Sequence, residues 1–244
     1  MGAALEIQIK PIPKNVADQI VKKYHYSGKV VSNSTLNLGV LYQDKLYGAM
    51  QLGSPMDKSK ILPLVSGTEW NNMIELNRMA FSDVLPRNSE SRAISLAIKW
   101  IKKNAPHIEW IVSFADGTQC GHGTIYQAAN FHLTQIKKNT TIIQMPNGDK
   151  TTWLSVGSGG DKYGREQRLK GYSSSVKFLN ECYPGWKKLE GYMYRYIYFV
   201  NPKAKKRYIG EFVPFSKIKE LNIQMYKGQW VENSTTTFDE LKNG

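Results

Sequence analysis

The sequence has 244 residues, of which 41% are hydrophobic, so it is long enough to bury a core and needs no more than one or two domains. Lysine and arginine number 33 against 20 acidic residues, and the formal net charge is +13. This charge favours polyanionic partners such as nucleic acid, although an ordinary basic protein has the same composition. Two cysteines exclude a disulfide framework, and no apolar run reaches the roughly 20 residues of a membrane span.

These properties predict a cytoplasmic protein without a membrane partner. We expect a single catalytic domain over residues 1–232, followed by a disordered tail over 233–244.

The first quarter of the chain predicts a strand, a helix and a hairpin. Alternating apolar and polar residues indicate a strand over 5–10, and apolar residues at helical spacing indicate a helix over 14–24. Two further strands, 36–42 and 46–52, flank the polar break 43–45, which is typical of a hairpin turn.

The middle of the chain alternates strands and helices. A loop over 53–70 precedes a predicted series of five elements: strand 73–81, helix 89–103 with Ser89 as its N-cap, strand 108–115, short helix 121–131 and strand 132–137. This order predicts an α/β fold with a central mixed sheet flanked by helices.

The C-terminal part, about 139–232, is basic and aromatic. Residues 139–175 are rich in Gly, Ser, Thr and Lys, and the glycine-rich, basic stretch 155–175 predicts a mobile loop, whereas 191–200 predict an aromatic strand. Between 162 and 228 the sequence has fifteen basic and five acidic residues. The candidate phosphate contacts are Lys162, Arg165, Arg168, Lys203, Lys205, Lys206 and Arg207. The candidate base-stacking residues, which are equally suited to packing the core, are Tyr163, Tyr172, Trp186 and Tyr192.

Residues 70–135 resemble the core of GNAT acyltransferases. In that family a short helix ends in a tyrosine followed by Gly-Phe four and five positions later, and here Tyr126 is followed by Asn130-Phe131. The resemblance implies that Tyr126 protonates a leaving group, while the alternative is a tyrosine that packs on the sheet.

A GNAT protein also holds a pyrophosphate at the start of its long helix, with a glycine-rich loop. The matching segment here, 86–92, has no glycine, and Glu90 opposes a bound anion. The predicted contacts to the cofactor are Ser89, Ser91, Arg92 and Asn130.

Polar residues near the ends of two strands are candidates for catalysis. Alternation along strand 73–81 predicts Glu75 and Asn77 on one face and Arg78 on the other. Charged groups inside a strand are either functional or paired, so Glu75 is a candidate base and Arg78 a substrate contact, unless an ion pair uses them. Asp116 ends the next strand and is a second candidate base, or simply a turn residue.

Two short clusters contain potential metal ligands. His25-Tyr26 follows the first helix, and Cys120-Gly121-His122 follows a buried strand. Neither cluster has the spacing of a structural zinc site, and a histidine at a helix end is often only a cap.

Taken together, these segments resemble the phage Mom proteins over most of residues 14–200. The resemblance is carried by His25-Tyr26-Ser27, Glu75-Leu76-Asn77-Arg78, Ser91-Arg92, Phe114-Ala115-Asp116, Gly123–Ala128 and Arg195–Phe199. It implies a GNAT fold and transfer of a carbamoylmethyl (acetamido) group to N6 of adenine in double-stranded phage DNA, which protects that DNA from host restriction. It also implies acetyl-CoA and iron as cofactors, with His25 and Tyr26 as iron ligands, and an active site that includes Arg78, Asp116 and Tyr126.

The donor is left open by this resemblance. Acetyl transfer would give an N-acetyl group, so acetyl-CoA requires a metal-assisted radical step, and the alternative is an activated glycine derivative. Two other functions fit parts of the sequence: a conventional GNAT N-acetyltransferase acting on a protein, RNA or small amine, and a non-catalytic DNA-binding protein.

Overall fold

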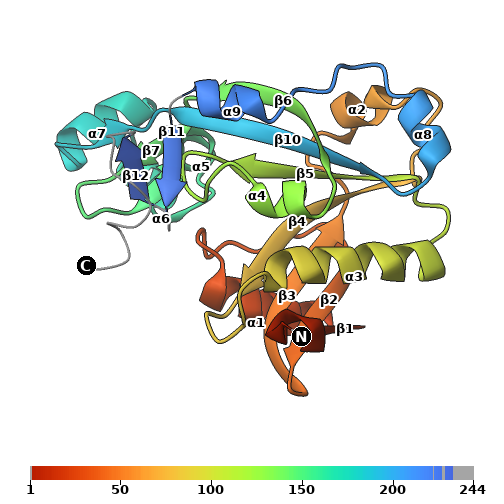
Figure 1. Ribbon diagram of the computed structural model, residues 1–244. Helices are drawn as coiled ribbons and strands as arrows, with labels where there is room; N and C mark the ends of the chain where they lie inside the picture. The colour runs from red at the N-terminus through yellow and green to blue at the C-terminus, as the bar shows by residue number, and fades with distance from the viewer. Residues whose placement is uncertain (1, 222, 227–228, 233–244) are drawn as a thin grey trace.

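The computed structural model describes residues 2–221, 223–226 and 229–232, and its centre is a mixed seven-stranded sheet (Figure 1). The strands lie in the order β1 (Gln8–Pro11), β2 (Ser34–Tyr42), β3 (Lys45–Gly53), β4 (Met73–Phe81), β5 (Trp110–Asp116), β10 (Gly191–Phe199) and β6 (His132–Asn139). All neighbours are antiparallel except β4 and β5, which are parallel. The predicted α/β class with a GNAT-like mixed sheet is confirmed.

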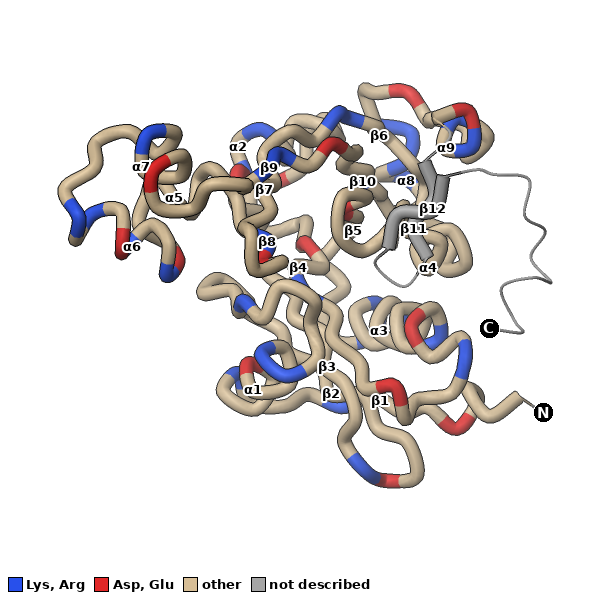
Figure 2. The backbone as a smooth tube through the Cα atoms, turned by 90° about the vertical axis from the view of Figure 1, so that its left-hand side faces the viewer, with Lys and Arg blue, Asp and Glu red and all other residues tan. Residues whose placement is uncertain are grey.

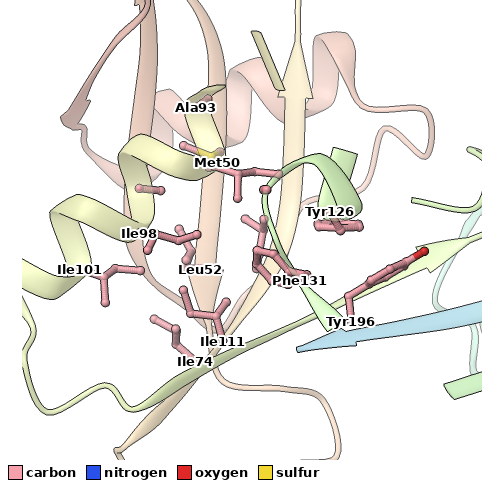
Figure 3. Close-up of a cluster of buried hydrophobic side chains, with 14 of the residues drawn as sticks. Met50, Leu52, Ile74, Ala93, Ile98, Ile101, Ile111, Tyr126, Phe131 and Tyr196 are labelled. Atoms are coloured by element: carbon pink, nitrogen blue, oxygen red, sulfur yellow. The ribbon is translucent and has the colours of Figure 1, made fainter. Parts of the chain in front are cut away.

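The two long helices cover opposite faces of this sheet. Helix α1 (Lys14–Tyr24) packs on the face of Gln51, whose side chain donates a hydrogen bond to Asp18 of that helix. Helix α3 (Ser89–Asn104) packs on the face of Leu52, in the main hydrophobic core. Figure 3 shows its isoleucines against the strands, with Tyr126 of α4 (Thr124–Ala128) beside them. The remaining elements are η1 (Ala3–Glu6), α2 (Lys58–Ile61), η2 (Leu62–Leu64), α8 (Pro202–Lys206), α9 (Ser216–Glu220), β11 (Ile223–Tyr226) and β12 (Gln229–Glu232).

A β-bulge at Asn77 changes the predicted faces of β4. Leu52 pairs with Leu76 but Gln51 pairs with Arg78, so Asn77 is the extra residue between them. A bulge shifts the alternation by one residue, and directly paired residues project to the same face. Arg78 therefore joins Glu75 on the α1 face, and the prediction that they lie on opposite faces is wrong.

Strands β4 and β5 separate just after this bulge. They pair only from Met73 to Leu76 on one side and from Trp110 to Ser113 on the other. Beyond those residues each strand continues without the other, so an opening forms between their carboxyl ends. Ligands in open α/β sheets bind at such ends.

Residues 140–189 form an inserted unit between β6 and β10, and the prediction of a mobile loop over 155–175 is wrong. The unit comprises β7 (Ile142–Gln144), β8 (Lys150–Thr152), α5 (Trp153–Ser158), α6 (Lys162–Leu169), α7 (Ser175–Cys182) and β9 (Lys187–Lys188). It has a hydrophobic cluster of its own, centred on Ile143, Phe178 and Leu179. Side chains of Thr152, Asp161 and Ser174 cap its helices, which are too short to show a long apolar period.

Most other predicted elements are confirmed with small shifts. Helix α1 has the predicted limits, and β2, β3, β4, β5 and β10 fall within two residues of theirs. The loop 53–70 contains α2, the helix predicted over 121–131 is shorter, and the N-cap of α3 is Asn88 and not Ser89.

Near the two ends of the chain, the structure differs from the prediction at the first strand and does not describe the last residues. The strand predicted over 5–10 begins only at Gln8, after the 3-10 turn η1. The predicted tail over 233–244 lies outside the described residues. Among the described helices, none has the length and apolar character needed to cross a bilayer.

Candidate active site

A cavity of about 410 Å³ opens where β4 and β5 separate. It collects residues from five segments: the loop after α1, strand β4, the end of β5 with the turn that follows it, α4, and β10 through Met193. All six residues predicted for catalysis or metal binding line this central cavity, namely His25, Tyr26, Glu75, Arg78, Asp116 and Tyr126. Residues spread over about a hundred positions of the sequence thus meet in one space of the size typical of ligand pockets.

Glu75 has the properties of a general base. Burial raises the pKa of its carboxyl to about 7, against a smaller lowering effect of Asn77 and Arg78. Within the described part of the chain Glu75 forms no ion pair, so the alternative of a salt bridge is not supported. A carboxyl with a pKa near neutrality can take and return a proton at physiological pH.

Arg78 connects β4 to the loop after α1. Its Nε donates to the carbonyl oxygen of Lys29 at 3.0 Å, and its Nη1 donates to the carbonyl oxygen of Asn77 at 2.7 Å. The guanidinium therefore holds the loop that carries His25 and Tyr26 against the strand. It lines the central cavity at the same time.

Asp116 combines the two roles that its position in the sequence allows. Its Oδ1 accepts hydrogen bonds from the backbone N–H of Thr118 at 2.9 Å and from Nδ2 of Asn139 at 3.2 Å. Its Oδ2 accepts from Gln119 at 2.7 Å. The carboxylate is only 7% exposed and shapes the turn, although it also borders the central cavity. With both oxygens engaged, it is less suited to accept a proton than Glu75.

The hydroxyl of Tyr126 is buried beside Ser113. Ser113 Oγ lies 2.9 Å from the tyrosine oxygen and 3.1 Å from the carbonyl oxygen of Leu76. A serine has one hydroxyl hydrogen, and a carbonyl oxygen can only accept. We therefore infer that Ser113 donates to the carbonyl oxygen of Leu76 and accepts from the hydroxyl of Tyr126. Burial raises the pKa of Tyr126, so it remains a neutral donor. The centroid of its ring also lies 5.1 Å from that of Tyr196, as expected for a tyrosine that packs on the sheet.

Asn77 was not singled out from the sequence, because alternation along a strand does not reveal a bulge. Its Nδ2 donates to the carbonyl oxygen of Ser54 at 3.4 Å, and the side chain lines the central cavity. Its Oδ1 is buried without a hydrogen-bond partner among the described residues. A buried acceptor without a donor is costly, and this oxygen has almost no accessible surface through which a ligand in the cavity could reach it.

His25 and Tyr26 do not fit the iron site that the resemblance implies. The backbone N–H of Ser27 donates to Nδ1 of His25 at 3.1 Å, and Ser27 Oγ lies 2.8 Å from the same nitrogen. Nδ1 is therefore an acceptor and Nε2 carries the hydrogen, whereas a histidine bound to a metal normally donates from its other nitrogen.

Two further observations concern His25 and the second candidate cluster. Burial, with a smaller contribution from Arg78, lowers the pKa of His25 to about 4. No group of three or more His, Cys, Asp and Glu side chains arranged for a metal occurs in the described residues, Cys120 and His122 included.

Only one of the four predicted cofactor contacts borders a cavity. A space of about 340 Å³ at the start of α3 is lined by Ser91, together with Arg87 and Glu90. Ser89 is buried and donates its hydroxyl hydrogen to the carbonyl oxygen of Pro86, so it is not available to a cofactor. Arg92 and Asn130 line no described cavity, and Asn130 instead adopts a left-handed conformation with φ of 62° at the end of α4.

The predicted phosphate contacts separate into two groups (Figure 2). Lys162 and Arg165 line a cavity of about 650 Å³ beside the central one, and Arg168 is bonded to the carbonyl oxygen of Ser158 on the inserted unit. The other four lie in or just after α8, near Trp110 at the opposite end of the sheet, because β10 runs antiparallel to β5. These four are Lys203, Lys205, Lys206 and Arg207.

Arg207 has a structural role. It forms an ion pair with Glu109 and donates to the carbonyl oxygen of Ser66. The 650 Å³ cavity also contains two lysines that the sequence analysis missed, Lys29 and Lys150. No local pattern identifies them, since one follows a helix and the other lies in a polar hairpin.

The aromatic residues proposed for base stacking pack inside the molecule. Tyr163 is 4% exposed, and Tyr172 and Trp186 belong to the hydrophobic cluster of the inserted unit. Tyr192 packs against the main core. For these four residues the packing interpretation holds.

Comparisons with known proteins add two kinds of finding. The sequence matches the Mom protein family over residues 6–217. Over 206 residues it is 35% identical to the methylcarbamoylase Mom of Escherichia phage Mu, an alignment that covers 83% of this chain and 79% of that protein.

Similar solved structures are acetyltransferases with low sequence identity. An acetyltransferase of Bacillus subtilis in complex with CoA has a TM-score of 0.42 and 11% identity, covering 80% of this chain and 97% of that one. The ribosomal-protein-S18-alanine N-acetyltransferase of Escherichia coli has a TM-score of 0.44 and 11% identity, covering 86% and 99%.

Proposed function

The chain belongs to the Mom protein family, and from this premise we propose that it transfers a carbamoylmethyl group to N6 of adenine in DNA. It is a transferase, as the methylcarbamoylase of phage Mu is by name. The observation that carries the proposal is the central cavity, where Glu75 with a pKa near 7 lies among Arg78, Asp116 and Tyr126.

The proposed roles follow from the chemistry of an exocyclic amine. Adenine N6 is a weak nucleophile because its lone pair is delocalised into the ring, and it carries two N–H groups. Glu75 removes one of these protons as the new bond forms, and Asn77 lines the cavity beside it. Arg78 and Asp116 keep the surrounding loop and turn in place through their hydrogen bonds.

The donor must supply both carbon and nitrogen. In the product, N6 is bonded to a methylene carbon, and the amide nitrogen lies on the far side of the carbonyl. N6 loses one proton to Glu75, and the bond between the donor and its leaving group breaks. Tyr126 is the candidate proton donor to the leaving group, with its hydroxyl turning away from Ser113 to do so, and the proton that Glu75 takes from N6 balances the one that Tyr126 gives up. Acetyl-CoA alone lacks the amide nitrogen, so the alternative donor is an activated glycine derivative whose carboxyl group is already an amide and whose α-carbon carries the leaving group.

Three cavities suggest how two substrates reach one site. The space at the start of α3 shares Thr124 and Ile125 with the central cavity, and the 650 Å³ space shares Tyr26 with it. We assign the first approach to the donor and the second to DNA. The target adenine has to leave the base stack to enter such a pocket.

The test is mass spectrometry of nucleosides from DNA of cells that express the chain, beside the Glu75→Gln variant. We expect deoxyadenosine carrying one added carbamoylmethyl group, and its loss in the variant. Feeding the cells with ¹³C-acetate or with ¹³C-glycine identifies the source of the two carbon atoms that are transferred.

Unmodified DNA in cells that contain folded protein contradicts the proposal. N6-acetyladenine, or acetylation of a protein or RNA, would instead establish a conventional N-acetyltransferase. Modified adenines that block cleavage by restriction enzymes would agree with a role in protecting phage DNA. Since the relative is encoded by a phage, we place this reaction in the cytoplasm of the host.

A further inference from the structure

A second cavity lies directly beside the active site. It measures about 650 Å³ and lies between the loop after α1 and the inserted unit. Tyr26 lines both cavities, and Gln119 of the second is followed in the chain by Cys120 of the central one. A ligand bound in the second cavity therefore reaches the active site past Tyr26.

The second cavity is positively charged. Four basic residues line it, Lys29, Lys150, Lys162 and Arg165, against two acidic ones. Both acidic side chains are engaged: Asp149 pairs with Lys162, and Asp161 caps α6 by accepting from the N–H of Gly164. Lys150 and Arg165 form no ion pair with another described residue. The cavity is thus suited to a phosphate backbone.

Tyr26 presents an aromatic ring at the junction of the two cavities. It is 53% exposed, and its ring lies 4.2 Å from that of His25 at an angle of 32°. His25 is itself fixed: its backbone N–H donates to Val21 at the end of α1, and Nδ1 accepts from the N–H of Ser27. An exposed aromatic ring backed by a fixed one, beside a cationic groove, is the arrangement on which proteins stack nucleic-acid bases.

These contacts disagree with metal binding by the same pair. The N–H of Ser27 can only donate, so the lone pair of Nδ1 is used and Nε2 carries the hydrogen. A metal on Nε2 would require a hydrogen on Nδ1, directed at another hydrogen. The arrangement of His25 and Tyr26 is therefore better explained by stacking of their aromatic rings than by binding of a metal through their nitrogen and oxygen atoms.

We propose that Tyr26, supported by His25, stacks on the extruded adenine of the DNA substrate, while Lys29, Lys150 and Arg165 hold the phosphates next to it. This inference rests on the proposed function and specifies how the same site captures its substrate. It assigns the His25-Tyr26 pair to base capture and not to iron.

The test compares DNA binding by the full-length protein and its Tyr26 variants, without any donor. Each protein is titrated with a duplex that contains one mispaired adenine and with the same duplex carrying an abasic site there. We expect the wild-type protein to prefer the adenine duplex, and Tyr26→Ala to lose about 5- to 150-fold of that preference, the range of one base stacked on an aromatic ring.

Two variants separate the ring from the hydroxyl group. Tyr26→Phe keeps the ring and should keep the preference within about twofold. Trp70→Ala removes a similarly exposed ring elsewhere, since Trp70 is 58% exposed, and should change nothing. Iron content of the purified proteins, measured by elemental mass spectrometry, should not depend on the Tyr26 hydroxyl.

Either of two results would overturn the inference. One is an unchanged preference in Tyr26→Ala. The other is a Tyr26→Phe variant as defective as Tyr26→Ala and depleted of iron relative to the wild type. A wild-type protein that binds mispaired adenine but never modifies DNA would contradict the proposed function and leave base capture standing. If the protein prefers a mispaired adenine over an abasic site as strongly in an RNA duplex of the same sequence as in DNA, the assignment of DNA as the substrate is contradicted.

Discussion

The two ends of the central sheet contain similar residues and use them differently. At the end near α8, charged and polar groups are paired: Arg207 with Glu109, and the indole N–H of Trp110 with Thr68. At the active-site end, Glu75 lacks an ion pair among the described residues and Asn77 Oδ1 lacks a donor. Buried polar atoms without a partner also occur elsewhere, for example at Gln51 and Gln167, so the contrast between the two ends rests on Glu75, a buried carboxyl that forms no ion pair with another described residue.

The basic residues show the same contrast. The run 203–207 is the densest in the sequence, yet it lies in and just after α8, at the end of the sheet opposite the central cavity (Figure 1). Lys29, Lys150 and Arg165 are scattered along the chain but meet beside the active site. Density of charge in the sequence is therefore a poor guide to where a polyanion binds.

The largest effect is expected from Glu75→Gln, which keeps the size of the side chain and removes its basicity. Modification of DNA should fall by about 10²- to 10⁴-fold, the usual contribution of a general base. In the wild type, activity should rise as pH increases through about 7, where Glu75 loses its proton. The measurement is the rate of adenine modification over a pH range from about 5.5 to about 8.5.

The matched control is Glu211→Gln, an exposed carboxylate on the α8 side. It should retain both the rate and its pH dependence. A Glu75→Gln variant with a wild-type rate would show that another group removes the proton.

The second largest effect concerns binding of DNA. Replacing Lys29, Lys150 and Arg165 together by alanine should weaken binding by about 10²- to 10³-fold at low salt, and should reduce the slope of log affinity against log salt by roughly 2–3. The matched variant, Lys203→Ala with Lys205→Ala and Lys206→Ala, removes the same charge from α8. It should change affinity only a few-fold. Equal losses in the two triple variants would refute the assignment of the second cavity to DNA.

Glu75→Gln should also change stability, in the opposite sense to activity. The pKa of Glu75 in the folded protein, about 7, lies above its ordinary value of 4.5, so folding favours the protonated form. Wild-type stability that is present below pH 4.5 is lost as pH rises through 7. Glutamine stays neutral, and the variant should therefore be more stable at pH 8 by about 1–3 kcal/mol. Urea unfolding at pH 5 and pH 8 tests this, and a variant less stable at both pH values would contradict it.

A smaller loss of stability is expected at the other end of the sheet. Arg207→Ala removes the half-buried ion pair with Glu109 and should lower the free energy of unfolding by about 1–2 kcal/mol. Chemical denaturation measures the loss, and combining it with Glu109→Gln should cost less than the sum of the two changes. If Arg207 instead contacts DNA, affinity should fall while stability stays the same.

Much of the fold could be predicted because its signals are strong and local. Apolar periodicity identifies α1 and α3, and the aromatic run identifies β10. The helices of the inserted unit were not predicted, because they have only six to eight residues and two of them, α5 and α6, contain glycine. In such short elements, caps and tertiary packing outweigh periodicity.

The active site was predicted only in part, for geometric reasons. Glu75, Asp116 and Tyr126 lie near strand ends or on the short helix, where motifs can be recognised. The bulge at Asn77, by contrast, depends on pairing with β3, and the tautomer of His25 depends on the N–H of Ser27. Neither is encoded in the identity of the residue alone.

The smallest change in stability is expected at Asn130. This residue matches the family pattern because of its backbone conformation and not because of its side chain. It stands where the GNAT pattern has glycine, and its φ of 62° is a conformation that glycine adopts freely and asparagine tolerates. Asn130→Gly should change the free energy of unfolding by less than about 1 kcal/mol, whereas Asn130→Ala should lower it by about 1 kcal/mol. If the side chain binds the donor instead, both variants should raise the donor KM equally. A rise confined to the alanine variant, or no rise, would assign Asn130 to the turn that ends α4 and so leave donor binding to the start of α3.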